Sequence, residues 1–256
     1  MLSALALAIG YPQRLLAGDI SFDLQPGEAI AILGPNGSGK TTLFRTLLGL
    51  LPARAGEVRL GEQSLGSLSP AEIARHIAYV PQAANGFFNF SVIEVVKMAR
   101  AAHLPWYAQP GARDHALAID ALAELNIAAF ANRDFAELSG GERQLVMIAR
   151  ALASEARILL LDEPTASLDY GNQFLILDEI ARLKARGVAI LFTTHDPNQA
   201  MRIADRTLTI TRQGVVNIGA TRDIVTRDSL AELYAIDVQL LPGPGGPLIT
   251  VAANSP

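Results

Sequence analysis

The stretch Gly34-Pro35-Asn36-Gly37-Ser38-Gly39-Lys40-Thr41-Thr42 decides how the rest of this sequence is interpreted. It has the spacing G-x-x-x-x-G-K-[ST], in which glycines let successive backbone N–H groups turn into one concavity. The apolar run Ala29–Leu33 precedes it and predicts a buried strand, and leucines at helical spacing follow it. A strand, a glycine loop and a helix N-terminus in this order predict a site for phosphate groups.

Two side chains of this loop have the chemistry to act on a nucleotide. Lys40 supplies a point charge for the β- and γ-phosphates, and the Thr41 hydroxyl is placed to ligate Mg²⁺. The alternative is a glycine-rich turn that holds a lysine by chance. We favour the phosphate loop because both the strand and the helix that the motif needs are present.

Composition limits the class of protein. The chain has 256 residues, of which 50% are hydrophobic, enough for the core of one domain. A formal charge of −4 argues against a protein held to nucleic acid by bulk basicity, and the lack of cysteine excludes disulfides and thiolate metal sites. The apolar start, Met1–Ile9, has no basic n-region, so it predicts a strand rather than a signal peptide. No apolar run approaches the roughly 18–20 residues that span a bilayer.

Strands that alternate with helices predict an α/β fold with a mostly parallel sheet. Ile20–Leu24 alternates apolar and polar residues as a half-buried strand does. Between residues 83 and 137 the pattern becomes helical, with a capping box at Ser91 and Glu94 that opens a helix to about Ala102, and a second helix over Arg113–Leu125. We therefore expect one domain over residues 1–240, a helical subdomain at about 83–137 inserted in it, and a mobile tail at 241–256.

Asp162 and Glu163 follow the apolar strand Ile158–Leu161, at the strand end where ligands sit in open α/β sheets. Because neighbouring side chains of a strand point in opposite directions, the two carboxylates divide the work. We expect Asp162 to face Mg²⁺ and Glu163 to face an attacking water as general base. An Asp-Glu pair can also be a helix cap, but the phosphate loop upstream favours the catalytic interpretation.

Two interpretations fit the stretch Leu138-Ser139-Gly140-Gly141-Glu142-Arg143-Gln144. In the first, Ser139 caps a helix and Glu142 completes a capping box. In the second, two glycines at the helix entrance expose N–H groups that bind an anion. Glycine lowers helix stability there, so we infer that something approaches the backbone closely.

These motifs together resemble the ATP-binding cassette (ABC) ATPases. Gly34–Thr42, Gln82, Leu138–Gln144, Ile158–Asp169 and His195 occur in the order of that family, and the resemblance runs from about residue 2 to about residue 235. It implies a phosphate-loop NTPase core with an antiparallel β subdomain and an α-helical subdomain. It also implies ATP and Mg²⁺ as the groups that the site binds.

The resemblance assigns further residues. Gln82 matches the glutamine that senses Mg²⁺ and the attacking water, and His195 matches the switch histidine at the γ-phosphate, although a lone histidine at a strand end is usually structural. Tyr11 matches the aromatic that stacks on adenine, which we favour over an ordinary turn aromatic. Asp169 matches the loop that crosses the dimer seam. Glu142 stands where many members carry glutamine.

The family binds two ATP between two cassettes arranged head to tail. Each ATP contacts the phosphate loop of one chain and the Ser139–Gly141 stretch of the other, so the resemblance implies a second copy of this chain as partner. It implies catalytic roles for Glu163, His195 and Gln82, and Mg²⁺ ligands at Thr41, Gln82 and Asp162. The nucleotide-binding set is Tyr11, Gly34, Pro35, Asn36, Gly37, Ser38, Gly39, Lys40, Thr41, Thr42, Ser139, Gly140, Gly141 and Asp169.

A single cassette is typical of a separate transporter subunit, peripheral at the cytoplasmic face of the inner membrane. Polytopic permease subunits, and indirectly a substrate-binding protein, are then its partners, with no role for nucleic acid. The aromatic residues after Gln82 are either core residues or part of the permease docking surface, and we expect Phe87 and Phe88 near that surface. Tyr79–Gln82, the His103 region and Thr194–Ala200 resemble the metal-chelate importers of iron complexes, haem, cobalamin or molybdate.

Within that subfamily, Asn132–Phe135 and the surroundings of Gln173 look most similar to the molybdate-type members. Two alternatives remain open from the sequence. One is a soluble ABC ATPase that acts on ribosomes or chromosomes, which usually has tandem cassettes or a long coiled coil. The other is the motor of an exporter, which is more often fused to its channel.

Overall fold

The computed structural model describes residues 1–82, 89–105, 107–166, 168–241 and 248–251. The chain divides into two compact units, Met1–Leu68 with Ala189–Pro256, and Ser69–Val188. The expected positions of Phe87 and Phe88 lie outside the described residues.

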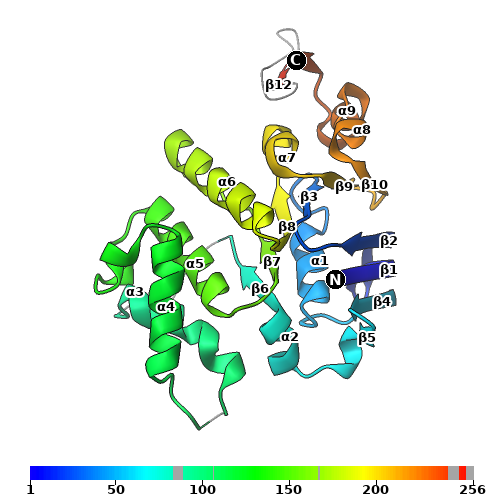
Figure 1. The fold of residues 1–256 in the computed structure, drawn as a ribbon. Coiled ribbons are helices and arrows are strands. Elements are labelled where there is room, and N and C mark those ends of the chain that lie inside the picture. The colour runs from blue at the N-terminus through cyan, green and yellow to red at the C-terminus, as the bar shows by residue number, and fades with distance from the viewer. Residues whose placement is uncertain (83–88, 106, 167, 242–247, 252–256) are drawn as a thin grey trace. The chain divides into compact units, whose positions relative to one another are not determined.

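One sheet of the first unit is antiparallel, with the strand order β2-β1-β4-β5 (Figure 1). Its strands are β1 (Leu2–Tyr11), β2 (Arg14–Leu24), β4 (Ala55–Leu60) and β5 (Gln63–Ser64). The alternation in the sequence matches the burial, since Ile20 and Phe22 are buried while Ser21 is exposed. This sheet confirms the expected antiparallel β subdomain.

The other sheet of the first unit places β3 (Ala29–Leu33) between β8 (Ala189–Thr194) and β9 (Arg206–Ile210), parallel to both. β10 (Val216–Ala220) pairs antiparallel with β9. All residues of β3 and β8 are buried. Because Leu33 pairs with Thr194, the phosphate loop and His195 leave the sheet from neighbouring strand ends. The helices of this unit are α1 (Lys40–Leu47), η1 (Leu65–Ser67), α7 (Pro197–Ile203), α8 (Thr221–Ile224) and α9 (Arg227–Tyr234).

A C-terminal hairpin lies against α7. β11 (Val238–Leu241) pairs antiparallel with β12 (Leu248–Val251). The Asn198 side chain of α7 makes two hydrogen bonds with the backbone of Ile249: its Nδ2 donates to the carbonyl oxygen at 3.1 Å and its Oδ1 accepts from the N–H at 2.8 Å. Of the segment expected to be a mobile tail, the structure describes Leu241 and Leu248–Val251, and both belong to this hairpin.

The second unit contains a parallel strand pair, β6 (Ile77–Val80) and β7 (Ile158–Leu161), in which Val80 lies opposite Leu161. Among the α-helices, α5 (Gly140–Ala153) packs mainly against three others, which Figure 1 shows around it. These are α3 (Val92–Lys97), α4 (Ala112–Glu124) and α6 (Tyr170–Ala185). The remaining helices are α2 (Pro70–His76), η2 (Met98–His103), η3 (Ala128–Phe130) and η4 (Phe135–Glu137).

One helix differs from the sequence prediction. The capping box of Ser91 and Glu94 is present, with the Ser91 N–H donating to Glu94 Oε2 at 2.7 Å. However, the α-helix that it opens ends at Lys97, and residues Met98–His103 continue as the 3₁₀-helix η2. The tighter winding of a 3₁₀-helix changes which side chains share a face, so periodicity over 91–102 could not show it.

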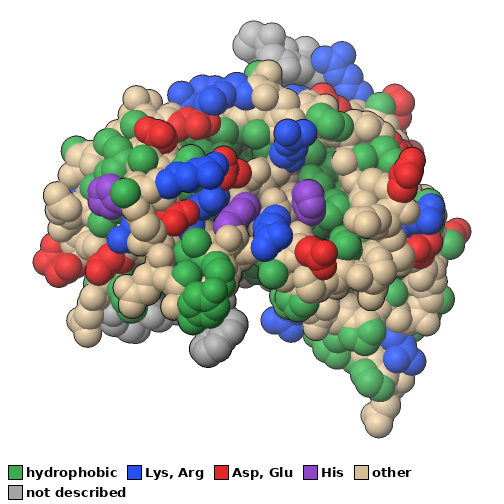
Figure 2. Space-filling view, turned by 60° about the horizontal axis from the view of Figure 1, so that its bottom comes forward, with side chains coloured by type: hydrophobic (Ala, Val, Ile, Leu, Met, Phe, Trp, Pro, Cys, Tyr) green, Lys and Arg blue, Asp and Glu red, His purple; other side chains and the backbone are tan. Residues whose placement is uncertain are grey.

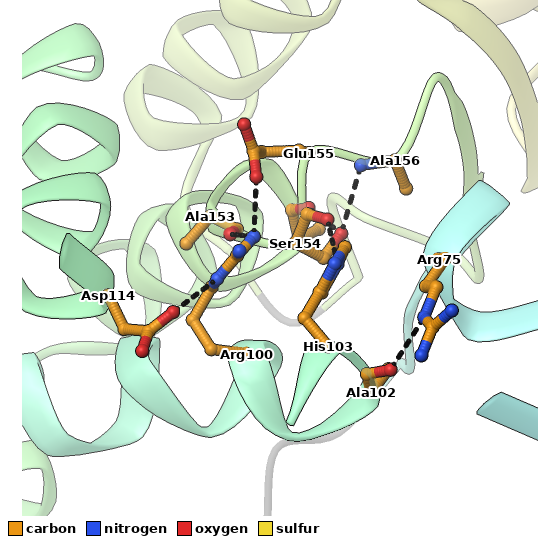
Figure 3. A network of polar contacts seen from close by, with 10 residues as sticks. Arg75, Arg100, Ala102, His103, Asp114, Ala153, Ser154, Glu155 and Ala156 are labelled. Atoms are coloured by element: carbon orange, nitrogen blue, oxygen red, sulfur yellow. Dashed lines mark hydrogen bonds and ion pairs between the residues drawn. The ribbon is translucent and has the colours of Figure 1, made fainter. Parts of the chain in front are cut away.

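A buried arginine joins η2 to α4 and to the end of α5 (Figure 3). The Arg100 guanidinium donates to Asp114 Oδ1 at 2.9 Å, to the carbonyl oxygen of Ala153 at 3.1 Å and to Glu155 Oε2 at 2.8 Å. His103 Nε2 lies 2.8 Å from the carbonyl oxygen of Ser154. Cationic and N–H donors therefore meet the negative end of the α5 dipole and fix η2 to it.

On the face of the molecule in Figure 2, lysine and arginine side chains are interspersed with acidic and hydrophobic ones. This mixture agrees with the small formal charge of −4. Among the described residues, none of the helices combines the length and the hydropathy that crossing a membrane requires.

Candidate active site

The phosphate loop follows the buried strand β3. Gly37 and Gly39 have φ angles of +82° and +111°, which glycine adopts without the strain that a side chain would cause. The Ser38 N–H donates to the Pro35 carbonyl oxygen at 3.2 Å, and the Leu43 N–H to the Gly39 oxygen at 2.8 Å. The loop is therefore closed by its own backbone hydrogen bonds and continues directly into α1. The N-terminal amides of α1 adjoin the loop.

Gly34 and Ser38 show that the loop is a cradle. A Cβ on Gly34 would lie 2.5 Å from the Ile210 carbonyl oxygen and 2.7 Å from Ser38 Oγ, so no side chain fits there. Ser38 Oγ is buried and has no hydrogen-bond partner among the described residues. Because a buried hydroxyl without a partner is unfavourable, this atom fits a site that is completed by a phosphate oxygen.

Lys40 lies in the same loop and is buried, with 6% of the residue's surface exposed. Its Nζ donates to the carbonyl oxygens of Gly34 at 2.7 Å and Pro35 at 3.3 Å. These contacts hold the ammonium charge over the first half of the loop. Thr41, the expected Mg²⁺ ligand, is exposed at the start of α1, while Thr42 is buried.

His195 follows β8 and is exposed, whereas its chain neighbours are held firmly. Thr194 Oγ1 donates to Gln199 Oε1 at 2.8 Å and accepts the Asp196 N–H at 3.1 Å. Asp196 caps α7 by accepting the Asn198 N–H at 2.9 Å. The backbone at His195 is thus fixed on both sides.

In the same unit, Tyr11 ends β1 with 43% of its surface exposed, which leaves its ring available for stacking.

In the second unit, the ends of β6 and β7 bring one expected pair of residues together. Gln82 Nε2 donates to Glu163 Oε2 at 2.9 Å, so the two residues that we expect around the attacking water are hydrogen-bonded. Glu163 has φ +47°, a left-handed conformation that is uncommon for a residue with a side chain. Such conformations concentrate at functional sites, because surrounding structure must enforce them.

Asp162 is buried at the end of β7. Its N–H donates to the Val80 carbonyl oxygen at 2.9 Å, and the Tyr79 hydroxyl donates to its Oδ2 at 3.3 Å. Sequence reasoning missed this role of Tyr79. The signal was available, since Tyr79 is a polar-tipped residue in an otherwise apolar strand that pairs with the strand before Asp162.

Both readings of the glycine-rich stretch before α5 are compatible with the structure. Ser139 caps the helix: its Oγ accepts the Glu142 N–H at 3.3 Å, and Glu142 Oε2 accepts the Ser139 N–H at 2.7 Å. The hydrogen bonds that Ser139 makes to the Glu142 carboxylate, first from its backbone N–H and then from its side chain, lower the pKa of Glu142 below its usual range. Gly140 is exposed and Gly141 is buried at the helix entrance.

The close approach that we inferred at the glycines has an internal component. A Cβ on Gly141 would lie 2.7 Å from Asn172 Cγ and 2.9 Å from Asn172 Oδ1. Asn172 is in turn held by Asp169, which caps α6 by accepting the Asn172 N–H at 2.9 Å and the Asn172 Nδ2–H at 2.7 Å. Packing therefore explains Gly141, while the exposed Gly140 is left to the anion interpretation.

The expected residues divide between the two units. The first holds Tyr11, Gly34–Thr42 and His195, and the second holds Gln82, Ser139–Gly141, Asp162, Glu163 and Asp169. The described residues contain no group of three or more His, Cys, Asp and Glu side chains suited to a metal ion. The expected Mg²⁺ ligands are instead a hydroxyl, an amide and a carboxylate, hard oxygen donors of the kind that Mg²⁺ takes together with substrate phosphates.

Comparison with known proteins decides the family. Residues 17–166, more than half of the chain, match the family model described as ABC transporter. This chain belongs to the ABC transporter family. It is 44% identical over 235 residues to an uncharacterised ABC transporter ATP-binding protein of Haemophilus influenzae, covering 92% of this chain and 89% of that protein.

Two further comparisons confirm the resemblance to the metal-chelate importers. A hemin import ATP-binding protein, HmuV of Thermobifida fusca, is 37% identical and covers 97% of this chain and 88% of its own. A solved structure described as a metal-chelate type ABC transporter in an inward-facing conformation superposes with a TM-score of 0.86 at 35% identity, over 98% of this chain and 96% of that one. This ABC protein is therefore an ATP-hydrolysing subunit of the importer type.

Proposed function

We propose that two copies of this chain close head to tail around two ATP molecules and thereby drive the import of a metal chelate or a metal oxyanion. One observation carries the proposal. The chain has two glycine-rich helix entrances in separate units, the phosphate loop at α1 and Ser139–Gly141 at α5. A dimeric relative supports it: the cassette MJ0796, solved as a dimer bound to ADP and phosphate, superposes with a TM-score of 0.74 at 27% identity, over 87% of this chain and 99% of that one.

Each residue then has a task at the composite site. The loop amides, Ser38 Oγ and Lys40 hold the β- and γ-phosphates, and the exposed ring of Tyr11 stacks on adenine. Glu163 accepts a proton from the attacking water, whose position the hydrogen-bonded Gln82 helps to set. His195 contacts the γ-phosphate from its fixed backbone, and Ser139–Gly141 of the second copy donate N–H groups to it.

Thr41, Gln82 and Asp162 are the residues that would hold Mg²⁺, which neutralises developing charge on the phosphates. Tyr79 orients the Asp162 carboxylate for this purpose by donating to Oδ2 at 3.3 Å. Asp169 lies at the seam between the copies, while its carboxylate keeps Asn172 against Gly141. Residues 1–240 act as one ATP-binding domain with the helical insertion at about 83–137, and 241–256 as its tail.

The cargo belongs to the class that the relatives' names indicate. Among them are hemin import proteins, iron chelatin transport proteins and the molybdate import protein MolC of Haemophilus influenzae, which is 39% identical over 87% of this chain and 83% of its own. We infer polytopic permease subunits as partners, a substrate-binding protein behind them, and a peripheral position at the cytoplasmic face of the inner membrane. Uptake of labelled molybdate against a ferric chelate separates the two cargo types.

Mixing two inactive variants tests the shared site. Lys40→Ala should lose nucleotide binding, and Ser139→Ala should keep binding but lose turnover. In an equal mixture, random pairing makes about half of the dimers mixed, and each mixed dimer regains one intact site, so about a quarter of parental ATPase activity should return. No recovery in the mixture, with both variants folded, would refute the head-to-tail site.

A further inference from the structure

Glu142 has a partner that the sequence motif does not predict. Arg133 NH1 lies 3.3 Å from Glu142 Oε1, and the guanidinium carbon lies 5.1 Å from the centre of the Phe130 ring. Both side chains of the pair are partly exposed, at 41% for Arg133 and 29% for Glu142. The arginine therefore places a positive charge beside the entrance of α5, with its guanidinium over the face of an aromatic ring.

The backbone holds Arg133 in this position. Its carbonyl oxygen accepts the Val92 N–H at 3.0 Å, and its N–H donates to the Phe130 oxygen at 2.9 Å. One residue further on, Asp134 forms an antiparallel bridge with Ser91. The segment that carries Arg133 is thus hydrogen-bonded to the start of α3. Because this backbone is already ordered, forming the ion pair costs less conformational entropy than an exposed ion pair usually does.

The Glu142 carboxylate uses both of its oxygens. Oε2 accepts the Ser139 N–H, and Oε1 faces Arg133. With its pKa lowered, this group is ionised at neutral pH. A negative charge in the first turn of a helix competes with any anion for the same positive field, so an unpaired Glu142 would repel a phosphate at Ser139–Gly141.

We propose that Arg133 is a positioning residue of the composite ATP site: it neutralises Glu142 and so keeps the entrance of α5 attractive to the γ-phosphate held by the second copy. The inference rests on the proposed function, because it assumes that Ser139–Gly141 faces a phosphate. It explains how the chain carries glutamate where a neutral residue would give the same helix cap.

Four proteins test this role through the local charge. The parent and the double variant Arg133→Met with Glu142→Gln have a net charge of zero at the pair, Arg133→Met has −1 and Glu142→Gln has +1. Methionine keeps a long stem against Phe130, and glutamine keeps an oxygen for the Ser139 N–H. The KM for ATP, measured by steady-state ATPase assay at low salt, should rise roughly two- to fivefold in Arg133→Met and fall by a similar factor in Glu142→Gln.

The double variant decides between charge and structure. If the role is electrostatic, adding Glu142→Gln to Arg133→Met returns the KM to the parental value, and 0.5–1 M salt flattens all differences because the Debye length shrinks to about 3 Å. A double variant as impaired as Arg133→Met, or an Arg133→Met protein with parental KM, would overturn the proposal. Melting temperatures establish that each variant is folded.

A second ion pair of similar exposure serves as the control. Arg59 Nε lies 3.5 Å from Glu57 Oε2, with side-chain exposures of 44% and 40%, on β4. Arg59→Met should leave the KM at the parental value. Ser139→Ala distinguishes failure of the proposed function from failure of this inference. If Ser139→Ala hydrolyses ATP at the parental rate, the shared ATP site is refuted. If its turnover is reduced but the KM for ATP does not depend on the charge of the Arg133–Glu142 pair, only this inference is refuted.

Discussion

Asn172 fills the space beside Gly141, so that a Cβ on the glycine would lie 2.7 Å from Asn172 Cγ and 3.1 Å from Asn172 Cβ. The second of these atoms is close to the backbone and cannot move aside cheaply. Asn172 is also held by two hydrogen bonds to Asp169, the cap of α6. The glycine at the start of α5 is therefore packed against the first turn of α6.

This contact predicts that Gly141→Ala destabilises the fold. Forcing a methyl group against Asn172 should lower the free energy of unfolding by about 1–3 kcal/mol, as overpacking does. Adding Asn172→Gly should recover most of that loss in urea unfolding, since it removes the obstructing side chain. If the double variant stays as unstable as Gly141→Ala, the asparagine is not the cause.

Glu163→Gln should lower ATP turnover by about 10²–10⁴-fold, the usual contribution of a general base. The phosphate loop is untouched, so binding of a fluorescent ATP analogue should keep its affinity. Glu62→Gln, at an exposed glutamate in the turn after β4, is the matched control and should turn over at the parental rate. Parental turnover in Glu163→Gln would remove the assignment of the base.

Ser38→Ala should separate stability from binding. Its hydroxyl is buried without a partner among the described residues, so removing it should leave the nucleotide-free protein equally stable or raise its melting temperature. The same change should weaken ATP binding roughly tenfold, because one hydrogen bond to a charged phosphate is lost. Thermal unfolding with and without ATP measures both effects; a lower melting temperature without ATP would contradict this account of the cradle.

The Arg100 network predicts an acid-sensitive contribution to stability. Hydrogen bonding to Arg100 holds the pKa of Asp114 below its ordinary value of 3.8, so the unfolded chain binds the proton more tightly than the folded one. The contribution is complete above about pH 5, begins to fall as the pH approaches the unfolded value of 3.8, and is lost as the pH falls through the lower, folded-state pKa. Asp114→Asn should melt at a lower temperature than the parent at pH 7, and the gap should narrow below pH 4. A constant gap from pH 7 to pH 3 would exclude Asp114 as its source.

The strands and most helices were predictable because local chemistry determines them. The phosphate loop needs a buried strand and a helix around its glycines, and Ala29–Leu33 and Lys40–Leu47 provide them. The capping boxes at Ser91 and Ser139 were likewise visible as short-range patterns and are present. The mostly parallel sheet then followed from the alternation of strands with helices, whereas the order of the strands was not predicted.

What the sequence could not show depends on contacts between distant residues. The pairing of Arg133 with Glu142 joins residues that no periodicity connects. The 3₁₀ winding of Met98–His103 coincides with Arg100 and His103 reaching the end of α5, a tertiary interaction. The packing reason for Gly141 was also hidden, because the glycine motif has a sufficient explanation in capping and anion binding alone.

The two hydrogen bonds between the Asn198 side chain and the Ile249 backbone have a practical consequence for truncated forms of this protein. They satisfy the N–H and the carbonyl oxygen of Ile249 as a neighbouring strand would, and they connect the C-terminal hairpin to α7 three residues after His195. A protein truncated after Leu241 would lose both of these hydrogen bonds to α7. Low ATPase activity in such a protein would therefore reflect the truncation and not the catalytic residues.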